Sequence, residues 1–256
     1  MRWQGLAMQA ISESVSLIRK PFAVRQGLRI ISYHTVGSAA YGDNLGLNTI
    51  SAERFREHVE ILAGKQMAAL SPLAIPKDKL QIAVTFDDGY ADNLYAAAPL
   101  LVERAIPFTV FVTSDFVRGR KNGFLTPDEL KQLAQVPGAT IGAHGRSHCN
   151  LTQCSDQELK SELADSKHYL EDLIGMSVKS LAYPYGATDM RVRDAAQSAG
   201  YEIGACSRFD INHAGRDPLL LNRCVILSTD TQRILRQKLQ GVWDWYRWRS
   251  TDPLKK

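Results

Sequence analysis

The sequence predicts an α/β fold built around a mainly parallel sheet, either open or closed into a barrel. Short apolar runs of strand-like composition alternate along the chain with amphipathic segments of helical spacing, and strands separated by helices pair in parallel. Residues of distinctive chemistry also follow several of the strands directly. The carboxyl ends of parallel strands are where active sites collect, so these residues are expected to share one site.

The expected strands are short and rich in β-branched and aromatic residues. They cover residues 28–33, 82–86, 108–112, 140–143, 178–183, 201–206 and 223–227.

The expected helices have recognisable ends. Ser51 is a suitable N-cap for a helix over 52–63, and Pro127 follows Thr126 as a first helical residue. Ser155 and Glu158 form a capping box for a long helix that stops at Gly175. Further helices are expected up to residue 103 and over 191–199 and 231–239.

The composition indicates an ordinary soluble enzyme-sized chain. Of its 256 residues 45% are hydrophobic, enough for a proper core, and no stretch approaches the length of a membrane span. The net charge of +4 comes without a dense Lys/Arg run, which argues against nucleic acid as a partner. Four cysteines without a zinc-ribbon spacing are expected to be reduced thiols.

The chain has no internal repeat and no convincing linker, so one domain is expected over residues 28–240. Residues 1–27 have apolar positions at helical spacing and predict a helical extension, which could pack on the domain or lie on a membrane surface. They do not read as a signal peptide. We therefore expect a cytoplasmic protein, with contact at the inner membrane face as an option.

Residues 241–256 form an aromatic and basic tail that contains the sequence VWDWYRW. These aromatic residues could stack on sugar rings or touch a membrane interface. Packing against the barrel or a second subunit is the interpretation we favour, and the sequence does not define the oligomeric state.

Two adjacent acids, Asp87 and Asp88, end the strand over 82–86 in the sequence TFDDGY. Their side chains point in different directions, so one carboxylate can bind a metal ion while the other accepts a proton. The alternative is a solvated turn in which Gly89 permits a positive φ angle.

Two histidines, His144 and His148, follow the strand over 140–143 in the sequence HGRSH. They can converge on one ion if the segment forms a helical turn. Together with one carboxylate they make a set of two histidines and one acid. Catalytic zinc sites have three protein ligands of this kind and leave a position open for water.

Tyr185 lies in the sequence AYPYG, where proline and glycine around an aromatic residue predict a rigid turn. A backbone N–H in such a turn could face a developing oxyanion. Taken alone, the segment indicates only a loop.

In this order and combination the motifs resemble the NodB-type polysaccharide deacetylases, carbohydrate esterase family 4. The resemblance extends over about residues 28–227 and includes TFDDGY, HGRSH, IGAH at 141–144 and LAYPYG at 181–186. It implies a single-domain, distorted and incomplete (β/α) barrel.

The resemblance also implies roles for the motif residues. Asp87 matches the general base of the family. Asp88, His144 and His148 match the ligands of one divalent metal ion, with zinc expected first and cobalt, nickel or manganese as alternatives. Tyr185 matches the residue whose backbone N–H helps to hold the oxyanion.

Two positions depart from the common pattern of the family. Ala182 stands where an arginine often braces the base, and Arg223 is a candidate to replace that brace. The C-terminal Leu-x-His that usually supplies the general acid is absent after Arg223.

A subset of the family, the exopolysaccharide deacetylases of the poly-N-acetylglucosamine type, resembles this chain in having a Tyr-His pair on the first strand. Here the pair is Tyr33 and His34, which makes His34 the candidate general acid. A structural hydrogen bond is the alternative for His34, and His213 is a weaker rival for the acid. The remaining histidines, His58 and His168, are expected to be surface residues of helices.

The resemblance implies a metal-dependent hydrolase that removes an N-acetyl group from an amino sugar in a polysaccharide or glycolipid intermediate. One alternative is a deformylase of a lipid-linked amino sugar. Another is a carbohydrate-binding homologue with impaired catalysis, which the missing arginine favours and the intact acid and histidine motifs oppose.

Overall fold

The computed structural model describes residues 26–254 of the chain. Its centre is a seven-stranded sheet with the strand order β8-β7-β6-β5-β4-β1-β9. All neighbouring strands pair in parallel, as the sequence predicts. The strands are β1 (Gly27–Tyr33), β4 (Leu80–Phe86), β5 (Phe108–Val112), β6 (Ala139–Ala143), β7 (Ser180–Ala182), β8 (Ile203–Ala205) and β9 (Arg223–Val225).

The sheet curls until its two edges nearly meet. Leu221, just before β9, pairs with Ala205 of β8 in an isolated parallel bridge. The Leu221 N–H donates to the Gly204 carbonyl, and the Cys206 N–H donates to the Leu221 carbonyl, each at 2.8 Å. Because β9 also pairs with β1 at the other edge, the sheet forms the expected distorted, incomplete (β/α) barrel.

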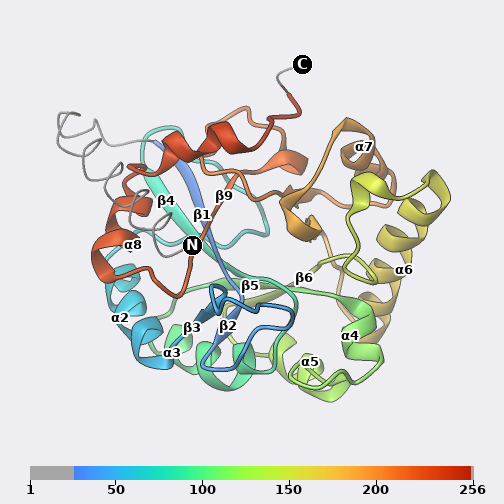
Figure 1. Ribbon diagram of the computed structural model, residues 1–256, viewed down its shortest axis with the longest axis horizontal. Helices are drawn as coiled ribbons and strands as arrows, with labels where there is room; N and C mark the ends of the chain where they lie inside the picture. The colour runs from blue at the N-terminus through green and yellow to red at the C-terminus, as the bar shows by residue number, and fades with distance from the viewer. Residues whose placement is uncertain (1–25, 255–256) are drawn as a thin grey trace.

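Helices cover the outside of the barrel. In Figure 1 they form an arc around the strands, from α8 and α2 on the left through α5 at the bottom to α6 and α7 on the right. Within residues 26–254, no helix combines the length and apolarity needed to cross a membrane. The helices are α2 (Ala52–Ala63), α3 (Ala98–Glu103), α4 (Ser114–Arg118), α5 (Pro127–Ala134), α6 (Asp156–Ile174), α7 (Met190–Ser198) and α8 (Gln232–Leu239).

The predicted capping residues set the helix ends. Ser51 accepts a hydrogen bond from the third residue of its helix, and Thr126 and Ser155 each form a full capping box with a glutamate. Gly175 ends α6 at φ 68°, a left-handed conformation that glycine adopts at little cost. The N-terminal signals of α2, α5 and α6 are therefore confirmed.

Three predicted strands are shorter than expected. β7, β8 and β9 cover three residues each, although the extended backbone continues beyond β7 and β9. The Tyr183 N–H still donates to Ala205, and the Ile226 N–H donates to Ser32. Pro184 then ends the β7 ladder, because it has no N–H to donate.

Two elements near the strand ends were not predicted. A small parallel sheet pairs β2 (Thr35–Val36) with β3 (Thr49–Ile50), and the β2–β3 loop, residues 37–48, connects them. The helix expected to end at residue 103 begins with a π-helical turn, η1 (Asn93–Ala97). The side-chain amide of Asn93 donates to the carbonyl of His34 at 2.9 Å, which ties this turn to the end of β1.

His58 is buried, so its prediction as a surface residue is wrong. Its Nε2 lies 3.0 Å from the carbonyl oxygen of Asp230, which can only accept. The Nδ1 atom therefore accepts from the Tyr33 hydroxyl at 3.1 Å. Burial lowers the pKa of His58 to about 4, so the ring is neutral at pH 7. His168 is exposed, as expected.

The aromatic segment near the C-terminus packs against the barrel. Trp243 is buried, and Asp244 at the start of the 3-10 turn η5 (Asp244–Arg249) forms a buried two-bond ion pair with Arg29 of β1. Trp248, in contrast, remains exposed. The helix predicted for residues 1–27 lies almost wholly outside the described residues, and Gly27 begins β1.

The four cysteines are free thiols, as expected. Cys149 and Cys154 lie in the segment between β6 and α6 with their sulfur atoms 3.2 Å apart.

Candidate functional site

The two adjacent acids at the end of β4 are both buried and point to different partners. Asp88 has φ 74° and Gly89 has φ 83°, so the chain turns sharply after the strand. A residue other than glycine seldom adopts a positive φ, and residues that do so cluster at active sites. The solvated turn that the sequence left open as an alternative is therefore excluded, because Asp87 is only 4% and Asp88 only 8% exposed.

Asp87 is held by Arg223 from the first position of β9. The guanidinium donates from Nη1 to Oδ1 at 2.7 Å and from Nη2 to Oδ2 at 2.9 Å. Burial alone would raise the pKa of Asp87, but the neighbouring guanidinium of Arg223 is the largest opposing influence, and the pKa is held below the usual value. Asp87 is thus an ionised carboxylate. Arg223 makes the contact that the family's usual arginine would make from position 182, where this chain has an alanine.

Asp88, His144 and His148 come together in a cluster whose ligand atoms all lie within 4.8 Å of one another. The Asp88 Oδ1 atom is 3.4 Å from His144 Nε2 and 3.2 Å from His148 Nε2. Two ligands bound about 2.0–2.1 Å from a tetrahedral zinc ion lie roughly 3.3 Å apart. The spacing of these three atoms therefore suits one small divalent ion.

The donor chemistry of the cluster fits a metal as well. His144 Nδ1 lies 2.8 Å from the Ala182 carbonyl, which can only accept, so Nδ1 carries the proton and Nε2 offers its lone pair. Burial lowers the pKa of His144 despite the neighbouring acids, which keeps the ring neutral. Among the described residues, no hydrogen bond reaches the buried Oδ1 of Asp88, and a cation would stabilise a buried carboxylate oxygen of this kind.

The segment that carries both histidines is a loop, so they converge without the helical turn that was the condition considered for their convergence. Gly145 and His148 adopt φ 73° and φ 65°, which a helix does not allow. The loop is shaped by Glu162 of α6, a buried acid that accepts from the N–H groups of Arg146 and Ser147 at 2.9 Å each. The Ser147 hydroxyl donates to the same carboxylate at 2.8 Å.

Glu162 was not predicted to belong to the site. It lies in the middle of α6, and in the sequence it looks like any other helix residue. In the structure it is buried, and its carboxylate binds the backbone of the loop between the two histidine ligands. A Cβ at Gly145 would lie 3.3 Å from its Oε2 atom, so the glycine in HGRSH makes room for this contact.

We expect Glu162→Gln to lower zinc affinity by about 10–100-fold, the usual loss when a residue that orients metal ligands is changed. The amide replaces one acceptor oxygen with a donor that faces two N–H groups. Competition with a chromophoric chelator would measure the affinity. Asp172→Asn, an exposed acid on the same helix, should bind zinc like the wild type. Equal affinities in both variants would contradict this role of Glu162.

His34 lies at the end of β1 and lines the same pocket as Asp87 and Asp88. It is one of the groups that lower the pKa of Asp87 and of Asp88. The His34 Nδ1 atom is buried and has no partner among the described residues. The alternative role for His34 was a structural hydrogen bond, and within residues 26–254 its Nδ1 atom makes none.

Tyr185 lines this pocket from the turn after β7 with a backbone φ of 60°. Its ring packs against His148 with the centroids 4.8 Å apart, and the side chain is 69% exposed. The turn is sharp, as the sequence PYG predicts, and places Tyr185 beside the metal cluster.

His213 does not reach the site. Its neighbour Asn212 pairs with Leu28 at the amino end of β1, whereas His34 follows the carboxyl end. Six residues of extended strand span about 20 Å. The prediction of His213 as a rival general acid is therefore wrong.

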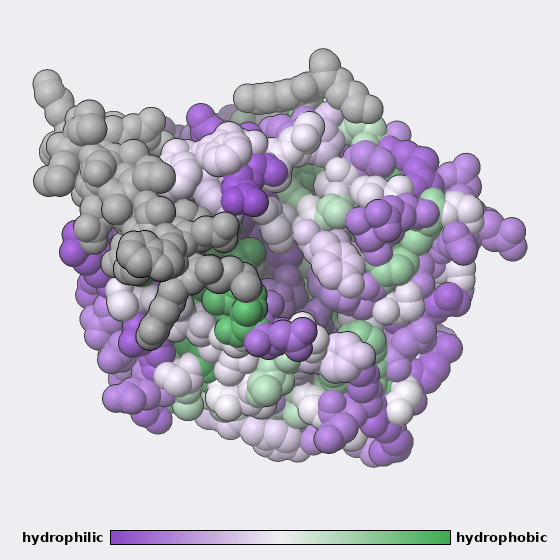
Figure 2. Space-filling model, in the orientation of Figure 1, coloured by the Kyte–Doolittle hydropathy of each residue, from purple (hydrophilic) through white to green (hydrophobic). Residues whose placement is uncertain are grey.

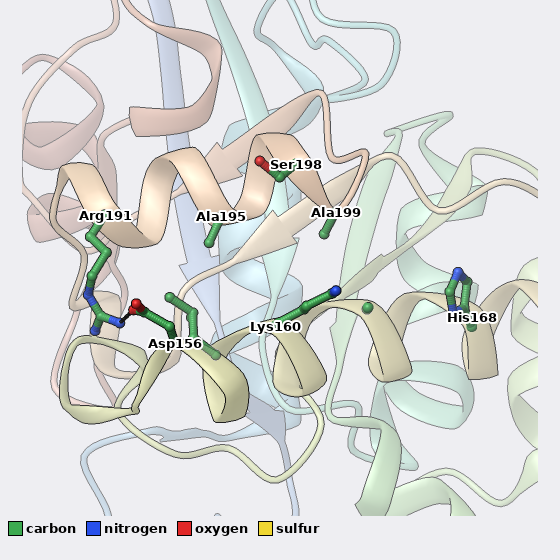
Figure 3. A pocket seen from close by; sticks show the side chains of 9 residues that line it. Asp156, Lys160, His168, Arg191, Ala195, Ser198 and Ala199 are labelled. Atoms are coloured by element: carbon green, nitrogen blue, oxygen red, sulfur yellow. Dashed lines mark hydrogen bonds and ion pairs between the residues drawn. The ribbon is translucent and has the colours of Figure 1, made fainter.

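The site opens as a pocket of about 260 Å³ at the carboxyl ends of the strands. The space-filling view shows the face of the molecule hollowed near its middle (Figure 2). A larger hollow of about 390 Å³ lies between α6 and α7 (Figure 3), where Asp156 is paired with Arg191. It lies between two outer helices and contains none of the motif residues, so we assign the chemistry to the smaller pocket.

Comparison with known proteins agrees with this geometry. A family model described as polysaccharide deacetylase matches residues 74–204. The protein YxkH of Bacillus subtilis, provisionally named a polysaccharide deacetylase, is 30% identical over 185 residues, or 69% of this chain and 63% of YxkH. A peptidoglycan-N-acetylglucosamine deacetylase of Bacillus cereus is 31% identical over 111 residues, or 43% of this chain and 38% of that enzyme. The chain thus spans less than two thirds of the length of these relatives.

Solved structures with the same fold include the deacetylase PplD of Streptococcus pyogenes. It aligns with a TM-score of 0.73 and 24% identity over 86% of this chain and 99% of PplD. IcaB of Ammonifex degensii aligns with a TM-score of 0.69 and 22% identity over 86% of this chain and 98% of IcaB. The family model covers just over half of the sequence and includes Asp87, Asp88, His144, His148 and Tyr185. The chain therefore belongs to the polysaccharide deacetylase family.

Proposed function

We propose that the protein is a metal-dependent hydrolase that removes N-acetyl groups from an amino sugar within a carbohydrate. The observation that carries this proposal is the joint placement of two differently held acids in one pocket. Asp88 converges with two histidines, and Asp87 is kept ionised by Arg223. Membership of the polysaccharide deacetylase family supports the substrate class.

Asp88, His144 and His148 would hold the divalent ion, and zinc suits a set of two histidines and one carboxylate. A bound divalent ion polarises a carbonyl group and lowers the pKa of water. Amide hydrolysis needs both effects, because an amide carbonyl is a poor electrophile and water a weak nucleophile.

The remaining steps belong to residues that line the pocket. Asp87 accepts a proton from the water that attacks the amide carbon. The Tyr185 N–H would stabilise the negative charge that develops on the carbonyl oxygen. His34 would donate a proton to the departing amine, because an amine leaves poorly without one.

His34→Ala tests the last of these roles. We expect the rate of amide cleavage to fall about 100-fold, the scale of a lost general acid. The rate for an activated acetate ester should fall much less, because its leaving group needs no proton. Steady-state rates on both substrates, with zinc content measured in parallel, would show the difference.

His213→Ala is the matched control for this experiment, because His213 lies at the opposite end of β1, and it should match the wild type on both substrates. Equal losses on amide and ester in His34→Ala would assign His34 a structural role. A wild-type amide rate in His34→Ala would remove it from the mechanism.

The acyl group and the sugar are tested together by mass spectrometry of the products. Oligomers of N-acetylglucosamine and their N-formyl counterparts would be incubated with zinc-loaded protein. Loss of acetyl groups is the expected result. Loss of formyl groups alone would favour the deformylase alternative, and binding without any loss would favour a carbohydrate-binding homologue. Three expectations from the sequence remain predictions: a glycolipid substrate, a cytoplasmic location and contact with a membrane.

A further inference from the structure

The β2–β3 loop forms one wall of the pocket that contains the acids and histidines. Ala40, Tyr41, Gly42, Asp43 and Asn48 line this pocket together with His34, Asp87 and Asp88. Tyr41 stands out because its ring is 67% exposed, the second largest exposed fraction among the apolar and aromatic side chains at this pocket. An exposed aromatic ring at the wall of a pocket offers a ligand there a large apolar face and a polar edge.

The loop is tied to the segment after β4 at Tyr41 itself, and further hydrogen bonds on both sides of Tyr41 hold the loop and β3 together. The Tyr41 N–H donates to the hydroxyl of Tyr90 at 2.8 Å, and Tyr90 lies two residues after Asp88. The Ala40 N–H donates to the Thr49 hydroxyl at 3.1 Å. Asp43 accepts from the Asn48 N–H at 2.6 Å, which closes the loop on itself. The backbone of Tyr41 is therefore fixed with respect to the acids of the site.

The ring of Tyr41 is fixed as well, by a cation on one face. The Lys121 ammonium lies 3.3 Å from the centroid of the Tyr41 ring and 3.8 Å from that of Phe116. The edges of Phe116 and Phe124 meet the Tyr41 ring at centroid distances of 6.3 and 6.2 Å. A cation over an aromatic ring is attractive and holds the ring in place. Because this face is occupied, the exposed area belongs to the opposite face and the hydroxyl edge.

We propose that the open face of Tyr41 is a subsite that stacks on a pyranose ring next to the sugar that loses its acetyl group. This inference rests on the proposed function, because it takes the substrate to be a chain of amino sugars. The C–H face of a pyranose is apolar and flat, and a tyrosine ring offers a large apolar surface with a polar edge. Lys121 holds the ring in advance, so binding orders few groups anew.

The subsite gives the protein a preference for oligomers over single sugars. A monosaccharide fills only the position at the acids and histidines, whereas a longer chain also covers Tyr41. The contribution of one well-placed aromatic contact is about 0.5–1.5 kcal/mol, which corresponds to a factor of about 2–10 in affinity.

The test compares Tyr41→Ala with the wild type on N-acetylglucosamine and its tetramers, both β-1,4- and β-1,6-linked. We expect KM for the better tetramer to rise about 5-fold, within the range of one aromatic contact, and the change for the monomer to be smaller. Tyr41→Phe should restore most of the affinity, because the stacking face remains. Lys121→Met should raise KM for the tetramer less than Tyr41→Ala does.

Tyr95→Ala is the matched control, because Tyr95 is a similarly exposed tyrosine at 60% that does not line the pocket. Its KM should equal that of the wild type. Calorimetric titration of the same tetramers into each zinc-loaded protein provides a readout independent of turnover. If the wild type releases acetate and Tyr41→Ala changes neither tetramer binding nor KM, the subsite is overturned and the proposed function stands.

The wild type could release no acetate while tetramer binding still weakens in Tyr41→Ala. That result would support the subsite and contradict the proposed function. Equal losses for monomer and tetramer would assign Tyr41 a role in shaping the pocket and overturn the subsite.

Discussion

Asp87→Asn is expected to lower deacetylation by about 10²–10⁴-fold while the protein keeps its zinc, because a lost general base costs about this much. Asparagine has nearly the same shape as aspartate but cannot take a proton from the attacking water. Asp88, His144 and His148 are untouched by the change, so the metal should remain. The measurement is the turnover number on an N-acetylglucosamine oligomer, with zinc determined by mass spectrometry on the same sample.

The control for this variant concerns stability, because Asp87 is also the partner of the buried Arg223. Removing one member of a buried ion pair typically costs about 3–5 kcal/mol. The melting temperature should therefore fall, and turnover must be compared at a temperature at which both proteins are folded. Loss of zinc together with activity would contradict the assignment and make Asp87 a ligand or a structural residue.

Replacement of a residue of the metal cluster should abolish both zinc binding and activity. We expect Asp88→Ala and His144→Ala to lower zinc affinity by more than about 100-fold, since even residues that only orient ligands contribute 10–100-fold. Removing Asp88 would leave the two histidines and no carboxylate in the ligand set. Inductively coupled plasma mass spectrometry of the dialysed proteins would give the zinc content.

His168→Ala is the matched control for these variants, because it removes an exposed histidine of α6 that lines the hollow between α6 and α7 instead of the pocket with the acids. It should retain one zinc ion per chain and full activity. Stoichiometric zinc in Asp88→Ala would show that the ion binds elsewhere and would contradict the proposed ligand set.

Much of the fold could be predicted because its signals are local. The helix start at Thr126, the capping box at Ser155 and the stop at Gly175 were predicted from a few neighbouring residues and are present in the structure. The near closure of the barrel was expected from the family resemblance alone. It depends on Leu221 reaching β8, a contact that no local pattern indicates.

The residues of the candidate site that could be predicted belong to short sequence motifs directly after strands, as for Asp88, His144 and His148. Contacts from distant segments were harder to foresee. Arg223 reaches Asp87 across 136 positions of sequence, and Glu162 shapes the histidine loop from the next helix. Arg223 was only a candidate brace in the sequence, and the structure confirms that it contacts Asp87. Glu162 resembles any other helix residue in the sequence, so only the fold identifies its role.

His58 shows where the sequence did hold a signal that was not used. It lies three residues after Phe55 and four before Leu62, on the buried face of α2. That spacing places it on the apolar side of the helix, where a histidine needs partners. The structure supplies the Tyr33 hydroxyl and the Asp230 carbonyl.

The most direct test of the central claim is a zinc titration of metal-free protein with acetate release from an N-acetylglucosamine oligomer as the readout. The account predicts no release without metal, a linear rise up to one zinc ion per chain and a plateau beyond it. Acetate release that is unaffected by complete removal of metal, or no release at any zinc concentration, would contradict it.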